Sequence, residues 1–166
     1  MVFPFGRQVS LRMEFIADVM LGKLAKYLRI LGYDTLYLSQ MDEEELISKA
    51  IQQKRMLLTR RTKIKRRGDI KDILFITQDN PKKQLREVCE RLHIMLVAGS
   101  LFTRCLSCNE ILVDLSKEKA EGKVPEHIFN AHDAFSFCPH CNRLYWPGTH
   151  REHMLQQNKN QARNIL

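Results

Sequence analysis

The sequence has 166 residues and a formal net charge of +8, from 27 lysines and arginines against 19 acidic residues. This length allows a single domain, or a compact domain with a small second module, and it is sufficient to bury a core. The basic balance favours an anionic partner, most commonly nucleic acid, although such a charge also serves solubility alone. No stretch approaches the ~20 apolar residues of a membrane span, so we expect no membrane partner.

The first twelve residues contain neither an apolar core nor a small-residue cleavage site, so they do not indicate a signal peptide. We expect residues 1–12 to be a disordered leader and the protein to be cytoplasmic.

The first predicted elements form a strand–helix–strand unit. Phe15-Ile16-Ala17 is a short apolar run typical of a buried strand, and it ends on Asp18. From Met20 to Leu31 the apolar residues recur at helical spacing, and Gly32 ends the helix. Aromatic and β-branched residues then predict a second strand between Tyr33 and Leu38. Parallel pairing of the two strands would place Asp18 at the carboxyl edge of the sheet, where α/β proteins have their sites.

Strands and helices continue to alternate along the next part of the chain. The pattern predicts a helix at 42–55, a strand at 56–59, a basic loop at 60–68, a strand at 72–77 and a helix at 81–92. Cys89 lies on the apolar face of the last helix and is expected to be a buried thiol. This alternation predicts a three-layer α/β domain with a mainly parallel sheet over residues 13–99.

Four of the five cysteines form two C-x-x-C pairs, Cys105 with Cys108 and Cys138 with Cys141, and an asparagine follows each pair. In a reducing compartment this spacing indicates metal binding. Two thiolate pairs supply the four ligands of structural Zn²⁺, while an iron–sulfur cluster and a redox dithiol are alternatives. We therefore expect a zinc ribbon over residues 100–150, followed by a polar tail at 151–166.

Several of these motifs together resemble a known family, the RNase domain at the C-terminus of the Mut-seven exonuclease. The resemblance extends from Met13 to about His153 and implies a PIN-like nuclease fold fused to a zinc ribbon. The residues that carry it are Phe15–Asp18, Leu21–Thr35, Leu57–Arg60, Gln84-Leu85, Arg104–Asn109 and Tyr145–His150.

The resemblance implies a ribonuclease that hydrolyses phosphodiester bonds of single-stranded RNA with Mg²⁺ or Mn²⁺ held by carboxylates at strand ends. Carried over by position, the candidate catalytic acids are Asp18, Asp42, Glu45 and Asp79. Each position also has an ordinary structural interpretation. Asp18 fits a loop cap, Asp42 fits a helix N-cap, and Asp79 fits a turn before a proline.

One position departs from the family pattern. The third strand is followed by Thr-Arg-Asp in the family and by Thr59-Arg60-Arg61 here. A guanidinium in that place would pair with the remaining acids and lower their affinity for a divalent cation. The alternative function is therefore a catalytically impaired RNA-binding protein of the same fold, unless Asp69 or Asp72 replaces the missing carboxylate.

The basic loop follows the third strand and so lies beside the expected site, where cations would bind RNA phosphates. A third interpretation is an adaptor whose zinc ribbon docks onto a protein partner. The expected RNA-binding residues are Arg60, Arg61, Lys63, Lys65, Arg66 and Arg67.

Overall fold

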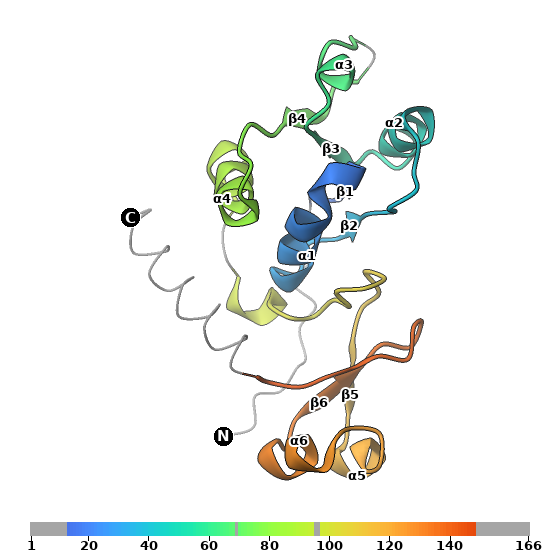
Figure 1. Cartoon of the computed structure of the whole chain (residues 1–166), viewed down its shortest axis with the longest axis vertical. Helices are drawn as coiled ribbons and strands as arrows, with labels where there is room; N and C mark the ends of the chain where they lie inside the picture. The colour runs from blue at the N-terminus through green and yellow to red at the C-terminus, as the bar shows by residue number, and fades with distance from the viewer. Residues whose placement is uncertain (1–12, 69, 95–96, 149–166) are drawn as a thin grey trace. The chain divides into compact units, whose positions relative to one another are not determined.

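The computed structural model of the chain describes residues 13–68, 70–94 and 97–148. The predicted leader, residues 1–12, and the predicted polar tail, residues 151–166, lie outside the described residues. The chain divides between Asn109 and Glu110 into two compact units, each with its own sheet (Figure 1).

The first unit is an α/β domain, as predicted. Its strands pair in the order β2-β1-β3-β4, and every neighbouring pair is parallel. In chain order the elements are β1 (Phe15–Ala17), the 3-10 helix η1 (Val19–Leu21), α1 (Gly22–Ile30), β2 (Thr35–Leu36), α2 (Glu43–Gln52), β3 (Met56–Thr59), α3 (Thr62–Lys65), β4 (Ile73–Phe75), α4 (Pro81–Arg91) and the 3-10 helix η2 (Ala98–Ser100).

The two faces of the sheet bury separate hydrophobic cores. Along β1, Phe15 and Ala17 belong to the core beneath α1 and α4, whereas Ile16 belongs to the core beneath α2 and α3. This division follows from the two-residue repeat of a strand, whose successive side chains point to opposite faces. Helices therefore cover both faces, and the predicted three-layer arrangement is confirmed.

The order of the strands determines where a site can form. From β1 the chain moves outward to β2 and then crosses to the other side, where β3 and β4 follow. The carboxyl ends of β1 and β3 thus flank the point where the strand order reverses, which is where open α/β sheets bind ligands. Asp18 directly follows β1, and Arg60 directly follows β3.

Glycine ends the first helix in the predicted way. Gly32 has a φ of +92°, and an added Cβ would lie 2.3 Å from the backbone oxygen of Ser100. Only glycine adopts this conformation without strain and leaves room for that contact. The helix itself ends at Ile30.

Two predicted elements differ from the structure. The second strand is limited to Thr35–Leu36, which is shorter than the predicted stretch from Tyr33 to Leu38. The expected basic loop contains a short helix, α3, because Ile64 is fully buried in the core beneath α2 and α3 and the cations around it face outward. Ile64 is a single apolar residue within the basic stretch at 60–68, so the charge pattern predicted a loop instead of a helix.

The second unit has a three-stranded antiparallel sheet in the order β5-β6-β7. The cysteine pair Cys138 and Cys141 occupies the turn between the second and third of these strands. The elements of this second unit are β5 (Val113–Leu115), α5 (Lys117–Ala120), α6 (Glu126–Ala131), β6 (Phe135–Phe137) and β7 (Leu144–Tyr145). The long insert between the two cysteine pairs therefore contains two strands, β5 and β6, and two short helices.

Candidate functional site

Asp18 lies at the carboxyl end of β1 and is fully buried. Its carboxylate is surrounded by donors. Oδ2 accepts the hydroxyl of Thr59 at 2.7 Å, and Oδ1 accepts the backbone N–H of Met20 at 3.4 Å, so that Asp18 caps η1. The predicted cap and the predicted site residue are thus the same group.

Arg61 contacts one of the four predicted acids, Asp18, and one acid that was not predicted, Glu43. Its Nε is 3.2 Å from Oδ2 of Asp18, and its Nη1 is 3.8 Å from Oε2 of Glu43. The guanidinium therefore bridges the end of β1 and the first turn of α2. The backbone N–H of Arg61 also donates to the hydroxyl of Thr59 at 3.0 Å, which fixes the turn that directs the side chain.

The other two acids predicted near α2 have structural partners. Asp42 is the N-cap of α2, and its Oδ1 accepts the backbone N–H of Glu45 at 2.8 Å. The side chain of Glu45 pairs with Lys49 at 3.5 Å on the helix surface. Glu43, which the sequence analysis did not select, is the acid of this turn that contacts Arg61. The ordinary structural interpretation of Asp42 as a helix N-cap is the one that the structure shows.

Asp79 follows β4 and is held by Arg60 in an ion pair that is open to solvent. Gln84 shapes this turn from within, since its buried side chain donates to the backbone oxygens of Gln78 and Asp79 at 2.9 and 3.2 Å. Consecutive arginines thus pair with different acids, Arg60 with Asp79 and Arg61 with Asp18.

Asp72 directly precedes β4 and so lies at the amino edge of the sheet, opposite Asp18. It does not replace the missing carboxylate. Asp69 lies outside the described residues.

Several residues of the basic stretch make contacts within the chain. Arg67 pairs with Glu44 at 2.8 Å, and Nζ of Lys65 lies 4.7 Å from the centre of the Phe75 ring. Lys63 and Arg66 are exposed. Together with the pairs made by Arg60 and Arg61, these contacts engage four of the six cations that were predicted to bind RNA.

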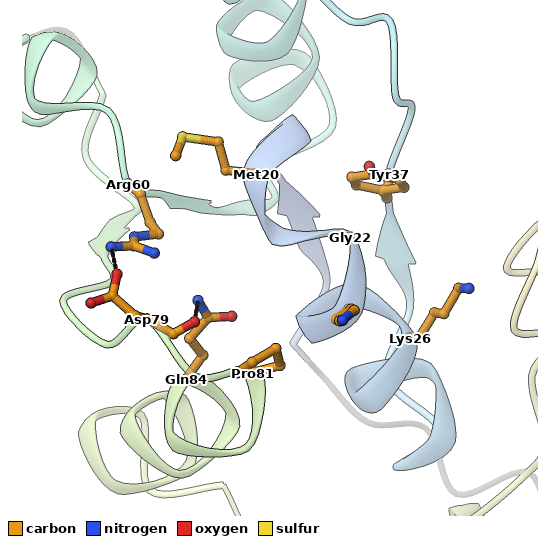
Figure 2. Close-up of a pocket in the computed structure, with 9 residues that line it drawn as sticks. Met20, Gly22, Lys26, Tyr37, Arg60, Asp79, Pro81 and Gln84 are labelled. Carbon is orange, nitrogen blue, oxygen red and sulfur yellow. Dashed lines mark hydrogen bonds and ion pairs between the residues drawn. The ribbon is translucent and has the colours of Figure 1, made fainter.

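A pocket of about 400 Å³ lies at the carboxyl edge of the sheet beside this site. Figure 2 shows Arg60 and Asp79 on one side of it and Tyr37 and Lys26 on the other. The ring of Tyr37 lies directly against Gly22, where an added Cβ would be 2.7 Å from the tyrosine oxygen. The lysines of this pocket, Lys23 and Lys26, were not predicted as site residues from the sequence. Their spacing of three residues on the helix that follows Asp18 was the available signal.

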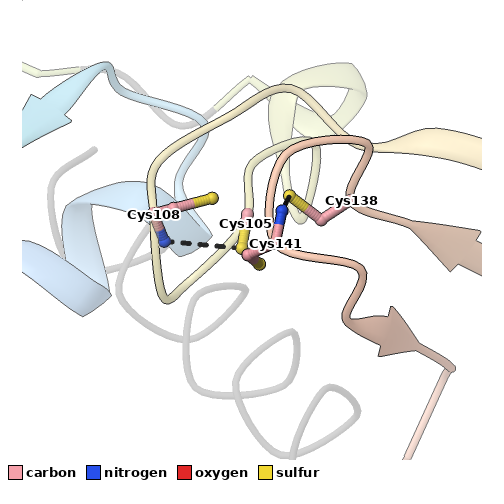
Figure 3. A group of neighbouring side chains, drawn as sticks. All are labelled: Cys105, Cys108, Cys138 and Cys141. Carbon is pink, nitrogen blue, oxygen red and sulfur yellow. Dashed lines mark hydrogen bonds between the residues drawn. The ribbon is translucent and has the colours of Figure 1, made fainter.

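Cys105, Cys108, Cys138 and Cys141 form a group whose sulfur atoms all lie within 4.8 Å of one another (Figure 3). Among residues 13–68, 70–94 and 97–148, it is the one group of three or more His, Cys, Asp or Glu side chains whose possible ligand atoms lie close enough together to hold a metal ion. Four thiols at this separation match the donor set of a tetrahedral site for a metal ion such as zinc. The prediction of a four-cysteine centre is confirmed.

The two cysteine pairs share one backbone geometry. The N–H of the second cysteine donates to the sulfur of the first at 3.5 Å in both pairs. The asparagines that follow, Asn109 and Asn142, both have positive φ values, of 74° and 58°. Asparagine tolerates the left-handed region better than most residues, which explains why it recurs after each pair.

Buried polar groups of the α/β unit hold the first of these pairs in place. Arg29 is 2% exposed, and its Nη1 donates to the carbonyls of Leu106 and Ser107 at 2.9 and 3.1 Å. The carboxylate of Asp34 accepts Nδ2 of Asn109 at 2.9 Å. The loop between Cys105 and Cys108 is therefore supported by the domain that carries Asp18.

Cys89 is separate from the cysteine group. Burial raises the pKa of its thiol to about 11, with a smaller contribution from the charge of Glu90. The thiol is partly buried and packs against the core beneath α1 and α4, in agreement with the predicted structural role.

Within the described part of the chain, no helix has both the length and the apolar character that a membrane span requires.

Comparisons with known proteins agree with the resemblance noted in the sequence. The Mut7-C RNAse domain matches residues 13–158, which cover both sheets and all four clustered cysteines. No curated protein and no solved structure matches the chain. The match covers most of the sequence, and the chain belongs to the Mut7-C RNAse domain family.

Proposed function

We propose that the protein binds single-stranded RNA at the carboxyl edge of its parallel sheet, with Arg61 in the place that a divalent cation requires for cleavage. The family supports RNA as the ligand, since its domain is an RNase domain. The observation that carries the rest is the contact between Arg61 and Asp18, at 3.2 Å in a site where the aspartate is fully buried.

The donor set around Asp18 differs from what the catalytic Mg²⁺ or Mn²⁺ implied by the resemblance would need. Hard divalent cations take oxygen ligands, usually carboxylates and water. Here the oxygens of Asp18 accept from Thr59, Met20 and Arg61, and Arg61 also faces Glu43. A guanidinium in contact with both carboxylates opposes a second cation at the same position. The residues as arranged do not fit the metal.

Zinc in the four-cysteine group has a different status. The thiols converge, and the backbone N–H groups within each pair donate to sulfur, so the residues fit a closed Zn²⁺ site. Bound zinc would supply structural cross-linking, because four protein ligands leave no open position for substrate. We assign Cys105, Cys108, Cys138 and Cys141 this folding role.

A second candidate is a ribonuclease that hydrolyses single-stranded RNA with Mg²⁺ or Mn²⁺. It is favoured by the position of Asp18 at the end of β1, where the strand order reverses. In that case Arg61 would have to leave Asp18 when the metal binds. A PIN-like hydrolase of this kind remains the function implied by the resemblance.

One experiment separates the two candidates. Labelled single-stranded RNA is incubated with wild type, Asp18→Asn, Arg61→Asp and Arg61→Met, each with Mn²⁺, Mg²⁺ or chelator, and binding and cleavage are followed in parallel. We expect wild type to bind RNA and to cut it no faster than Asp18→Asn does. We expect Arg61→Asp to gain metal-dependent cleavage. Arg61→Met removes the cation without adding an acid and should gain less.

Metal-dependent cleavage by wild type that is lost in Asp18→Asn would instead establish the ribonuclease. Absence of RNA binding by every variant would overturn both candidates and leave the adaptor interpretation.

A further inference from the structure

We propose that the 400 Å³ pocket beside Asp18 binds the phosphate of one nucleotide, with Lys23 and Lys26 as its principal cations. The proposal rests on the proposed function, because a nucleotide within an RNA strand is the expected occupant.

The cations of the pocket are arranged for an anion. Lys23 and Lys26 are both exposed and both line the pocket, three residues apart on α1, a spacing that places side chains on the same helix face. Arg60 contributes a third positive charge from the end of β3. The single acid of the lining, Asp79, is offset by its ion pair with Arg60. The pocket therefore carries a net positive charge.

The pocket differs in this respect from the basic stretch that follows it in sequence. Arg61, Lys65 and Arg67 are already engaged with Asp18, the Phe75 ring and Glu44. An RNA phosphate would have to compete with those contacts, whereas Lys23 and Lys26 are exposed and make no ion pair with any described residue. Lys63 and Arg66 are exposed as well, but they do not line the pocket. The first helix therefore provides the phosphate site that has a pocket beside it.

The size and lining of the pocket fit a nucleotide better than a bare ion. Its volume lies within the range of small-molecule pockets, roughly 300–1,000 Å³. Met20 lines it and is 60% exposed, so its side chain offers an apolar surface to a ligand. The ring of Tyr37 adds a second apolar surface and is fixed by the hydrogen bond from its hydroxyl to the carbonyl of Val19 at 3.1 Å. Sugar or base could lie on these two side chains while the phosphate meets the lysines.

The pocket and the Asp18 site are parts of one edge. Asp18 caps the 3-10 turn that contains Met20, and Arg60 and Arg61 are consecutive residues that serve the pocket and Asp18 respectively. A strand with one phosphate in the pocket would therefore lie along the sheet edge that carries Asp18. The pocket would set the register of the RNA on this edge.

Substitution of Asp79 provides a separate test of the pocket, because it should strengthen RNA binding. A phosphate in the pocket competes with the Asp79 carboxylate for Arg60, so replacing that carboxylate by a neutral amide should strengthen binding. We expect Asp79→Asn to bind RNA more tightly than wild type. A role for Asp79 in holding a metal would predict no such gain in the presence of chelator.

The test measures binding of a labelled single-stranded RNA to the full zinc-loaded chain by fluorescence anisotropy over a series of salt concentrations. The variant Lys23→Gln/Lys26→Gln is compared with Lys54→Gln/Lys71→Gln. The second pair removes the same charge from exposed positions at the amino edge of the sheet. We expect the pocket variant to bind about tenfold more weakly and its salt slope to fall by about 0.7 per lost phosphate contact. The amino-edge variant should change by less than about twofold.

Equal weakening by both variants would show a net-charge effect and overturn the proposal, as would no weakening by either. A second arm titrates wild type and the pocket variant with uridine monophosphate and follows amide chemical shifts of α1. If wild type binds no RNA but the mononucleotide shifts α1 in wild type alone, the proposed function fails while the pocket stands. Failure of the mononucleotide to perturb α1 in a chain that binds RNA independently of the lysines would place the RNA elsewhere.

Discussion

The guanidinium of Arg61 and the carboxylate of Asp18 are 3.2 Å apart at the carboxyl end of β1. Asp18 has no exposed surface, and a buried carboxylate is costly unless it is both paired and hydrogen-bonded. Arg61 provides the opposite charge, and the hydroxyl of Thr59 provides a hydrogen bond at 2.7 Å. Arg61 is thus a structural partner of the buried Asp18.

Removing Arg61 should therefore destabilise the fold. We expect Arg61→Met to lower the free energy of unfolding by about 2 kcal/mol, because it leaves a buried carboxylate without its counter-charge. Denaturant unfolding measures this. Arg86→Met is the matched control, since Arg86 pairs with Glu90 on the helix surface, where such pairs contribute only about 0.5 kcal/mol.

A second substitution identifies the cause of that loss. Adding Asp18→Asn to Arg61→Met should restore part of the stability, because the unpaired charge is then gone. If Arg61→Met unfolds at the same denaturant concentration as wild type, the ion pair has no structural role.

Removal of the metal should make four thiols reactive toward a thiol reagent, while the fifth, that of Cys89, should still react slowly. In the zinc-loaded protein we expect thiol reagents at neutral pH to react little with any cysteine, because four are ligands and burial raises the pKa of Cys89 to about 11. A chelator should release four reactive thiols in a fast phase. Cys89→Ala should leave that fast phase unchanged, and a fast phase of five thiols in wild type would contradict the buried position of Cys89.

Acid should weaken the support of the first cysteine pair through Asp34. Burial alone would raise the pKa of this carboxyl, but hydrogen bonds from Arg55 and Asn109 and the charges of Arg104 and Arg55 outweigh it and lower the pKa below its ordinary value. Because the folded-state pKa is lowered, this stabilisation is complete above the ordinary value and is lost as the pH falls through the folded value.

We expect Asp34→Asn to be less stable than wild type at neutral pH and to lose less stability between pH 5 and pH 2, as measured by denaturant unfolding at each pH. Asp114→Asn, which removes an exposed acid on β5, is the control. Parallel pH profiles for wild type and Asp34→Asn would show that Asp34 is not the source of the acid sensitivity.

The periodicity of the sequence predicted the α/β layers because each element has a simple local cause. The apolar run from Phe15 to Ala17, the glycine at position 32 and the Asn80-Pro81 helix start each determine structure within a few residues. The C-x-x-C spacing likewise predicted the cysteine group, because four thiols in two short turns have few other uses.

The candidate site was harder to predict because its geometry depends on which acid faces which cation across the sheet edge. Asp42 caps helix α2, and Glu43 is the acid of that turn that lies beside Arg61. Arg60 pairs with Asp79. The pocket lysines were missed for a related reason, since their role depends on the distant residues Tyr37 and Arg60. The prediction that Asp18, Asp42, Glu45 and Asp79 act together in catalysis stays a prediction.

The most direct measurement is Mn²⁺ binding to the zinc-loaded protein, followed by electron paramagnetic resonance, in wild type, Arg61→Asp and the double variant Arg61→Asp/Asp18→Asn. We predict that wild type and the double variant leave Mn²⁺ free in solution, while Arg61→Asp binds it. Binding of Mn²⁺ by wild type that disappears in Asp18→Asn would show that the cation displaces Arg61, and would contradict the central claim.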